Sequence, residues 1–321
     1  MLSAINQSSN LKSEFILAGF PGFQIWQHWL SIPLVLLFLL ATAANPILLA
    51  TIYREQCLHE PMYYLLGMLA LVDLVLSMLT TPKLLALLWF NDRTISHTEC
   101  FTQMFFVHCF LGLESGTFLV MAFDRYFAIC HPLSYSSVIT DRFVVKAAVL
   151  IFIRPLSLFV PMPFFFTRLH FCSNIIIEHS FCANLAVASL ACDDTKLHNI
   201  HQLVTAGSVL GLDLVLIALS YYLILRAVMK MRSKGASLKA FSTCTSHLIL
   251  ILFFYSILLV LAITYRPGNN VPPDVTILLN VLHLIVPPAL NPMVYGVRTK
   301  EINIGIIKIA QNVVGTYSLP T

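Results

Sequence analysis

The residues best placed for chemistry are an adjacent acid and base at the end of a long apolar run. Asp124-Arg125-Tyr126 follows an apolar stretch that contains Phe118 and Met121. Charges at the end of a membrane helix are costly unless they neutralise each other or find a partner on another helix. Two interpretations follow: Arg125 is a latch that holds and releases a neighbouring helix, or it is a snorkelling arginine that marks the membrane interface.

Two carboxylates stand near the middle of apolar runs, Asp73 in the second run and Glu114 in the third. An ionisable group at membrane depth is a functional hypothesis by default. The pair predicts a shared proton or a sodium site, completed by water and by hydroxyls such as Ser77 or Ser115. The alternative is that one carboxyl group is simply protonated and hydrogen-bonded. No other cofactor is predicted.

Helices must position these residues, because the composition is that of a membrane protein. Of the 321 residues, 58% are hydrophobic and 11% are charged, whereas soluble domains have about 25% charged residues. The apolar residues form blocks of membrane-spanning length, without the alternation of β-barrel strands. We predict an all-α membrane protein, a seven-transmembrane helix bundle with a short amphipathic C-terminal helix. The candidate spans are 29–53, 62–88, 99–127, 142–166, 200–226, 239–265 and 274–297.

Basic residues set the predicted orientation of the bundle. With the N-terminus outside the cell, the Lys- and Arg-rich segment 226–239 lies on the cytoplasmic side, as the positive-inside rule requires. We predict an extracellular N-terminal tail over 1–28, a seven-helix domain over 29–297 and a cytoplasmic tail over 298–321. Asn6 begins an N-x-S/T pattern, which predicts glycosylation of the outer tail.

The predicted cytoplasmic tail has the periodicity of an amphipathic helix. Ile302, Ile306 and Ile309 recur at helical spacing, and Lys300 and Lys308 stand between them. This pattern predicts a helix that lies on the inner leaflet of the membrane.

Proline residues predict interruptions in two spans. Pro155, Pro161 and Pro163 are expected to kink or end the outer half of the fourth span. Pro292 frees a backbone carbonyl in the seventh span, and we expect Asn291 to help satisfy it.

Four cysteines fall on the predicted outer side, where disulfides are permitted. Cys100 begins the third span, and Cys172, Cys182 and Cys192 lie in the long segment after the fourth. Four cysteines allow three pairings, and their positions in the sequence do not choose among them.

Five short motifs occur in order along the chain and resemble those of the rhodopsin-like G-protein-coupled receptors, most closely the odorant receptors. The motifs are Pro61-Met62-Tyr63, Met121 through Leu133, Ser220-Tyr221, Lys239 through Leu248, and Pro288 through Tyr295. The tail motif Gly19 through Gly22 and the pair Pro287-Pro288 are similar to the class I, fish-like branch.

The resemblance implies roles for residues that the chain leaves open. It implies the disulfides Cys100–Cys182 and Cys172–Cys192 and a sodium-type pocket at Asp73 and Glu114. It also implies a multi-pass plasma-membrane receptor that couples to the olfactory stimulatory heterotrimeric G protein and raises cyclic AMP. The implied coupling and switch residues are Asp124, Arg125, Tyr126, Tyr221, Asn291, Pro292 and Tyr295.

A small volatile odorant is expected to bind in the outer half of the bundle, between the third, fifth, sixth and seventh spans. On the sixth span, Tyr255 and Arg266 share a face by their spacing. We hypothesise that Arg266 anchors a short carboxylic acid or another polar odorant and that His108 hydrogen-bonds it. Alternatively, Arg266 snorkels or pairs with Asp274 or Glu178, and His108 is satisfied in the core. The predicted lining is His108, Leu111, Gly112, Thr205, Val209, Tyr255, Leu259, Ala262, Arg266 and Val281.

Other classes of membrane protein fit less well. A transporter usually shows repeated halves, and a channel needs a ring of polar side chains along one route. An enzyme needs a nucleophile with a base or a metal cluster, and the nearest pattern to a metal site is His198 with His201. We therefore predict a receptor with no catalytic residues, no bound structural metal and no nucleic-acid partner.

Overall fold

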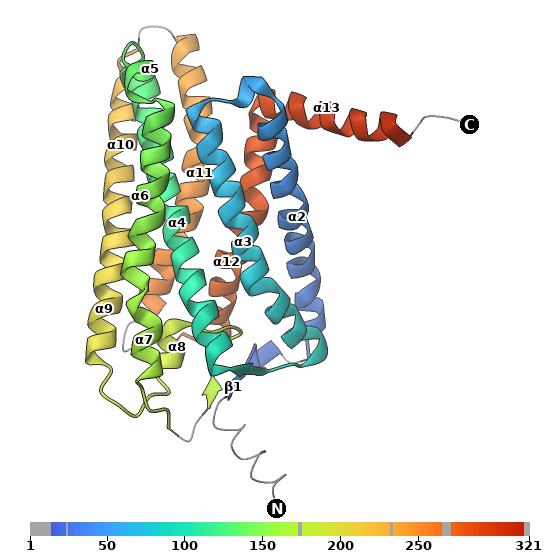
Figure 1. Ribbon diagram of the computed structural model, residues 1–321, viewed down its shortest axis with the longest axis vertical. Helices are drawn as coiled ribbons and strands as arrows, with labels where there is room; N and C mark the ends of the chain where they lie inside the picture. The colour runs from blue at the N-terminus through green and yellow to red at the C-terminus, as the bar shows by residue number, and fades with distance from the viewer. Residues whose placement is uncertain (1–13, 24, 173–174, 232–233, 265–270, 318–321) are drawn as a thin grey trace, which may run out of the picture.

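The computed structural model describes residues 14–23, 25–172, 175–231, 234–264 and 271–317. Seven of the helices in this described part are long and apolar enough to cross a membrane, which confirms the predicted bundle (Figure 1). The elements in chain order are β1 (Glu14–Leu17), the 3₁₀ helix η2 (Pro21–Phe23), α2 (Gln27–Arg54), the 3₁₀ helix η3 (Gln56–Leu58), α3 (Pro61–Phe90), β2 (Thr94–Ser96), α4 (His97–Cys130), α5 (Tyr135–Val138), α6 (Asp141–Phe159), α7 (Pro161–Thr167), β3 (Ile176–Ile177), α8 (Asn184–Ala188), α9 (Lys196–Ala206), the π-helix η4 (Gly207–Gly211), α10 (Leu212–Met229), α11 (Lys234–Thr264), α12 (Pro273–Arg298) and α13 (Lys300–Tyr317).

Helix α4 lies at the centre of the bundle. In the most apolar 18-residue stretch of α4, 61% of the stretch is buried inside the protein, whereas 22% of the corresponding stretch of α2, at the periphery, is buried. Its start is fixed by a capping box, in which the Glu99 backbone N–H donates to Ser96 Oγ at 3.2 Å and the Ser96 N–H donates to the Glu99 carboxylate at 3.1 Å. This central helix carries Glu114, Asp124 and Arg125, so it can contact most of the other spans.

A small sheet and two disulfides close the end of the bundle that we call the sheet end. Strand β1 pairs antiparallel with β2 and parallel with β3, in the order β2-β1-β3. Cys100 is bonded to Cys182 and Cys172 to Cys192, which confirms both pairings implied by the family resemblance. The first bond ties the start of α4 to the segment between α7 and α9, and the second closes a loop within that segment.

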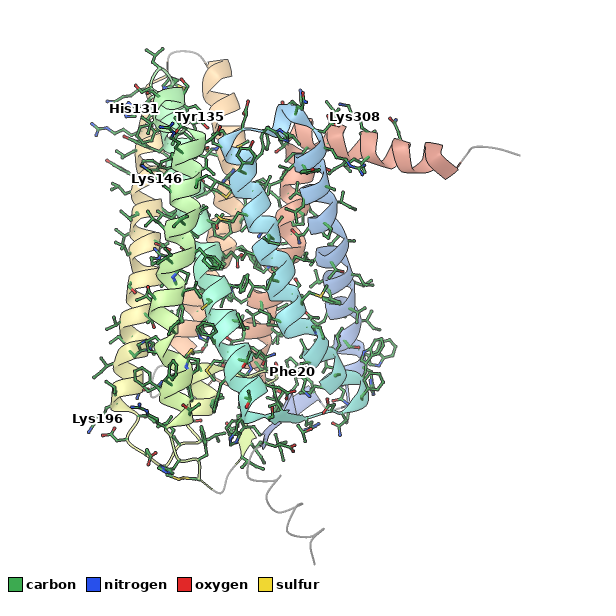
Figure 2. All side chains as sticks on the ribbon, in the orientation of Figure 1. Phe20, His131, Tyr135, Lys146, Lys196 and Lys308 are labelled. Atoms are coloured by element: carbon green, nitrogen blue, oxygen red, sulfur yellow. A yellow bond between two sulfur atoms is a disulfide. The ribbon has the colours of Figure 1, made fainter. Side chains whose placement is uncertain are left out.

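Helix α13 defines the opposite end of the bundle, which we call the α13 end, and it runs away from the bundle axis (Figure 1). The predicted C-terminal helix is therefore present. Ile302 is completely buried against the bundle, and Lys308 Nζ lies 2.7 Å from the Glu55 carboxylate beyond the end of α2 (Figure 2). The buried Ile302 and this ion pair thus hold the first half of α13 against the bundle.

The prolines interrupt the helices largely as predicted, but a different side chain compensates for one of them. The fourth span breaks at Val160, between α6 and α7. In α12, Pro292 cannot donate to the carbonyl of Pro288. Asn45 of α2 donates to that carbonyl at 2.9 Å instead. The prediction that Asn291 would serve here is wrong, because its amide donates to Asp73.

Candidate functional site

At the α13 end, Asp124 and Arg125 pair with each other and also contact neighbouring helices. Arg125 Nη2 lies 3.0 Å from Asp124 Oδ2 and contacts the Met62 sulfur of α3. The Tyr135 hydroxyl donates to Asp124 Oδ1 at 2.7 Å. Burial, and then the negative charge of Asp124, raise the pKa of Tyr135 above its usual value. The Asp124 carboxylate therefore joins α4 to α5, and Arg125 joins α4 to α3.

The other predicted switch residues surround this pair. Tyr126 shares a hydrogen bond of 3.1 Å with His131 Nε2. Tyr221 of α10 and Tyr295 of α12 are buried within electrostatic range of Arg125. Neither of these two hydroxyls has a hydrogen-bond partner in the described part of the chain. Both phenols are therefore available to accept or donate a hydrogen bond if the helices rearrange.

The structure brings the two carboxylates of α3 and α4 together. Asp73 and Glu114 are buried and interact electrostatically, and Asn291 Nδ2 donates to Asp73 Oδ2 at 2.8 Å. One oxygen of each carboxylate lacks a partner among the described residues. Ser77 Oγ donates to the backbone carbonyl of Asp73, so its proton is not available to the carboxylates. The open oxygens fit a shared proton or a small cation.

A second buried network joins four spans, and the sequence did not predict it. Arg154 of α6 makes a two-pronged ion pair with Asp213 of α10, both N–O distances being 2.6 Å. Ser115 of α4 donates to Asp213 at 2.6 Å, and its oxygen lies 2.8 Å from the Tyr255 hydroxyl of α11. Ser115 is therefore committed to this network, and it does not complete the Asp73–Glu114 pair.

Proton counting sets the direction of this hydrogen-bond chain. The single hydroxyl proton of Ser115 goes to the carboxylate, because a hydrogen bond to an ionised acceptor is the stronger one. Tyr255 must then donate to Ser115. The signal that was missed is Asp213 itself, an acid inside an apolar run like Asp73 and Glu114. The π-helix η4, which presents the Val209 carbonyl toward Ser115, ends two residues before Asp213.

A small apolar cluster in the half of the bundle toward the sheet end is built partly by the chain between α7 and α9. Val107 of α4, Phe181, Ala183 and Leu284 of α12 are buried together, and the predicted lining residue Leu111 packs against them. We call these four residues the outer cluster. The sequence prediction omitted Phe181 and Ala183, because the position of a long loop is set only by tertiary contacts.

The remaining predicted lining residues differ in whether their side chains are buried, already bonded or turned toward another helix. Thr205, Val209 and Val281 are buried. His108 Nδ1 bonds to the Met104 carbonyl at 2.8 Å. Gly112 faces the fourth span rather than a ligand space, because a Cβ there would lie 2.7 Å from Pro155 Cβ.

The predicted face of the sixth span differs from the one that the structure buries. Leu259 is 61% exposed and Ala262 is also exposed, whereas Tyr255 is buried. Phe254 and Leu261 lie at the centre of the buried side. Because each residue turns a helix by about 100°, Tyr255 lies near the edge of that side, and positions chosen from it alone fall outward. Two other predicted sites, Arg266 and Asn6, lie outside the described residues.

The contacts bear on two alternatives from the sequence analysis. One is Asp274 as a partner for Arg266, and the other is a metal site at His198 and His201. Asp274, one candidate partner for Arg266, accepts the Gly22 backbone N–H at 3.0 Å and so ties η2 to α12. His198 shares a hydrogen bond with Asn184 and His201 with the Leu158 carbonyl. The described residues contain no group of three or more side chains that could hold a metal ion.

The fold, together with the motifs at Asp124-Arg125-Tyr126 and Pro288 through Tyr295, defines a rhodopsin-like receptor with seven membrane-spanning helices. Residues 34–312 match the family model described as "Olfactory receptor". The chain is 55% identical to human olfactory receptor 56A1, over 97% of this chain and 98% of that protein. It is 47% identical to mouse olfactory receptor 56B34 over 96% of each chain, and 41% identical to human olfactory receptor 51G2 over 92% of this chain and 95% of the other. The chain belongs to the olfactory receptor family, a family of multi-pass membrane proteins.

Proposed function

We propose that this receptor binds a small volatile odorant at the sheet end of the bundle and activates a stimulatory heterotrimeric G protein at the α13 end, raising cyclic AMP. The orientation that this requires has the N-terminus outside the cell. Basic side chains such as Lys146 and Lys308 gather at the α13 end (Figure 2), as the positive-inside rule expects of a cytoplasmic face. Both disulfides lie at the other end, as an oxidising exterior permits.

The observation that carries the proposal is an unbroken path along α4 between the two ends. Leu111 packs against the outer cluster and also against a large buried apolar cluster that includes Phe118, Phe254 and Tyr295. Ser115, one turn further along α4, holds Tyr255 and Asp213. Asp124 and Arg125 follow on the same helix. A ligand that shifts the outer cluster therefore acts on the same helix that carries Asp124 and Arg125.

The Tyr255–Ser115 hydrogen bond is one point at which this path reaches α11. An odorant that moves Tyr255 changes one bond to an already satisfied network, so the movement costs about one neutral hydrogen bond, roughly 0.5–1.5 kcal/mol. A displacement of α11 relative to α4 and α10 then alters the surroundings of Arg125. Release of Arg125 from Asp124 and Met62 would open the α13 end to the G protein.

The chemistry around His108 bears on the class of odorant. Its Nδ1 must carry the proton, because the bond at 2.8 Å is to a carbonyl oxygen. In a neutral ring Nε2 is then an acceptor. It suits the O–H of an alcohol or of a protonated acid, while the Arg266 guanidinium would pair with an ionised carboxylate. We propose short acids and other polar odorants as the ligand class.

Substitution of Arg125 tests the proposed coupling. In cells that express the receptor, Arg125→Ala is expected to abolish the odorant-dependent rise in cyclic AMP, because the proposed switch group is removed. Binding of the odorant to the receptor, measured on isolated membranes, is expected to be retained. Arg142→Ala is the matched control, since Arg142 is exposed at the same end. A normal cyclic AMP response from the Arg125 variant at equal surface expression would contradict the assignment.

A further inference from the structure

His283 of α12 is a buried histidine near the middle of the seventh span, and the described chain gives it no hydrogen-bond partner. The side chain is 3% exposed, and neither ring nitrogen is bonded to any group in the described part of the protein. The residue lies about 15 Å along α12 from Pro273, at a rise of 1.5 Å per residue. An ionisable side chain at this depth is a functional hypothesis by default.

Each of the other buried histidines in the described spans has at most one open ring nitrogen. His198 bonds the Asn184 side chain at 2.7 Å, and at His247 only Nδ1 lacks a partner. An imidazole always carries at least one N–H, and a buried donor without a partner loses the hydrogen bond that it makes to water in the unfolded chain. His283 therefore lowers the stability of the empty receptor, and a partner for it has to come from outside the chain.

His283 lies between the outer cluster and the rings that contact Tyr255. Leu284, the next residue, belongs to the outer cluster. The His283 ring packs against Phe254 of α11 with the centroids 4.9 Å apart. Phe254 in turn packs against the Tyr255 ring at 5.1 Å and against Phe118 of α4 at 5.5 Å. A molecule bound to His283 would therefore act on the rings that join α12, α11 and α4.

The surroundings of His283 restrict what can bind to it. No charged side chain among the described residues acts on the ring electrostatically, so an ionised acid or amine would be buried there without a counter-charge, which is costly. A buried water molecule typically makes about three hydrogen bonds, and the side chains of Phe254 and Leu284 offer none. A hydroxyl group on an apolar body needs fewer polar partners, because the body of the molecule packs against the outer cluster.

We propose that His283 binds the hydroxyl group of an alcohol odorant beside the outer cluster, and that it makes the receptor prefer alcohols to hydrocarbons of the same size. A neutral imidazole has one donor and one acceptor nitrogen. A hydroxyl group can bond to either nitrogen, whereas an aldehyde or a ketone can bond only to the N–H. The inference rests on the proposed odorant function and gives it a ligand class and a contact residue.

Removal of the imidazole tests its state in the receptor without ligand. His283→Leu is expected to raise the melting temperature of the purified full-length protein by a few degrees, because it replaces an unsatisfied polar group with an apolar one of similar size. His28→Leu, at an exposed histidine of α2, is the control and should leave the melting temperature unchanged. A lower melting temperature for His283→Leu would show that the receptor itself bonds the imidazole, and this result would overturn the proposal.

A paired panel of odorants tests the ligand class. Straight-chain alcohols from butanol to octanol are each compared with the alkane that has one more carbon atom, and thermal stabilisation of the receptor in lipid nanodiscs measures binding. In the wild type we expect an alcohol to stabilise the receptor at a concentration about tenfold lower than its alkane does. His283→Leu should lose this preference, and His283→Gln, which keeps a donor and an acceptor, should retain it. Equal effects of alcohols and alkanes on the wild type, or an unchanged preference in His283→Leu, would overturn the proposal.

The cyclic AMP assay separates this site from the proposed signalling function. If an alcohol stabilises the receptor through His283 and does not raise cyclic AMP, the site is supported and the signalling proposal fails. If alcohols raise cyclic AMP equally in the wild type and in His283→Leu, the signalling proposal stands and the assignment of His283 is wrong.

Discussion

The least replaceable side chain in the network that joins four spans is Asp213. It is completely buried and accepts hydrogen bonds from both Arg154 nitrogens and from Ser115. Removal of one partner from a buried ion pair costs far more than the pair contributes, because the other charge is left uncompensated. The network therefore constrains the positions of α4, α6 and α10 through a single carboxylate, and Tyr255 adds α11 to it.

Asp213→Asn is expected to lower the free energy of unfolding by roughly 3 kcal/mol, the lower end of the range for a broken buried pair. The lower end applies because the Arg154 side chain is 30% exposed and can reach water. Thermal unfolding of the detergent-purified receptor measures the effect. Asp193→Asn is the control, since its pair with His170 is at the surface, where solvent screens the charges, and it is expected to change the stability little. Equal melting temperatures for the two variants would contradict the network's importance.

Among the elements, α12 is the one whose shape depends most on other helices. Its three internal prolines remove backbone donors, and Asn45 of α2 satisfies one of the freed carbonyls. Asn291 uses its amide to hold Asp73 of α3. The seventh span is thus attached to the first and second spans by two side-chain amides. The segment around its three prolines is a natural place for the helix to bend.

Asn45→Ala is expected to destabilise the receptor by about 1–3 kcal/mol, because the buried Pro288 carbonyl loses its partner. Thr42→Ala, one turn earlier on α2, removes bonds only to carbonyls of the same helix and should have a smaller effect. Thermal unfolding of both variants, with hydrogen exchange over α12, measures the difference. If the exchange of α12 in the Asn45 variant matched the wild type, the assigned role would be wrong.

At the scale of the whole molecule, the sheet end is a cap assembled from distant parts of the chain. Strand β1 joins β2 and β3 in one sheet, and the Gly19 backbone N–H donates to the His179 carbonyl at 3.2 Å. The His179 ring is 2% exposed and packs on Phe181 of the outer cluster. Burial lowers the pKa of His179 to about 3.

The cap is therefore expected to loosen in acid. Between pH 6.5, about the ordinary pKa of histidine, and pH 3, the unfolded cap binds a proton that the folded cap excludes. Stability is fully present above the ordinary pKa and is lost as the pH falls, by at most about 1.4 kcal/mol per pH unit. Hydrogen exchange of 175–190 at pH 7.5 and pH 5 should show this loosening in the wild type and not in His179→Phe. His170→Gln, altered at an exposed histidine, should behave as the wild type does, and acid loosening that persists in His179→Phe would assign the effect to another group.

The sequence by itself determined the number and order of the spans, because runs of apolar side chains and the need to satisfy backbone groups leave only helices in a membrane. It also located Asp124 and Arg125, Asp73 and Glu114, whose charge within apolar runs is a local signal. Tertiary structure alone decided several other contacts. Helix rotation turned Leu259 and Ala262 outward, packing gave the Pro288 carbonyl to Asn45, and the folding of a long loop brought Phe181 into the outer cluster. These outcomes depend on contacts between residues far apart in the chain, and no local pattern encodes them.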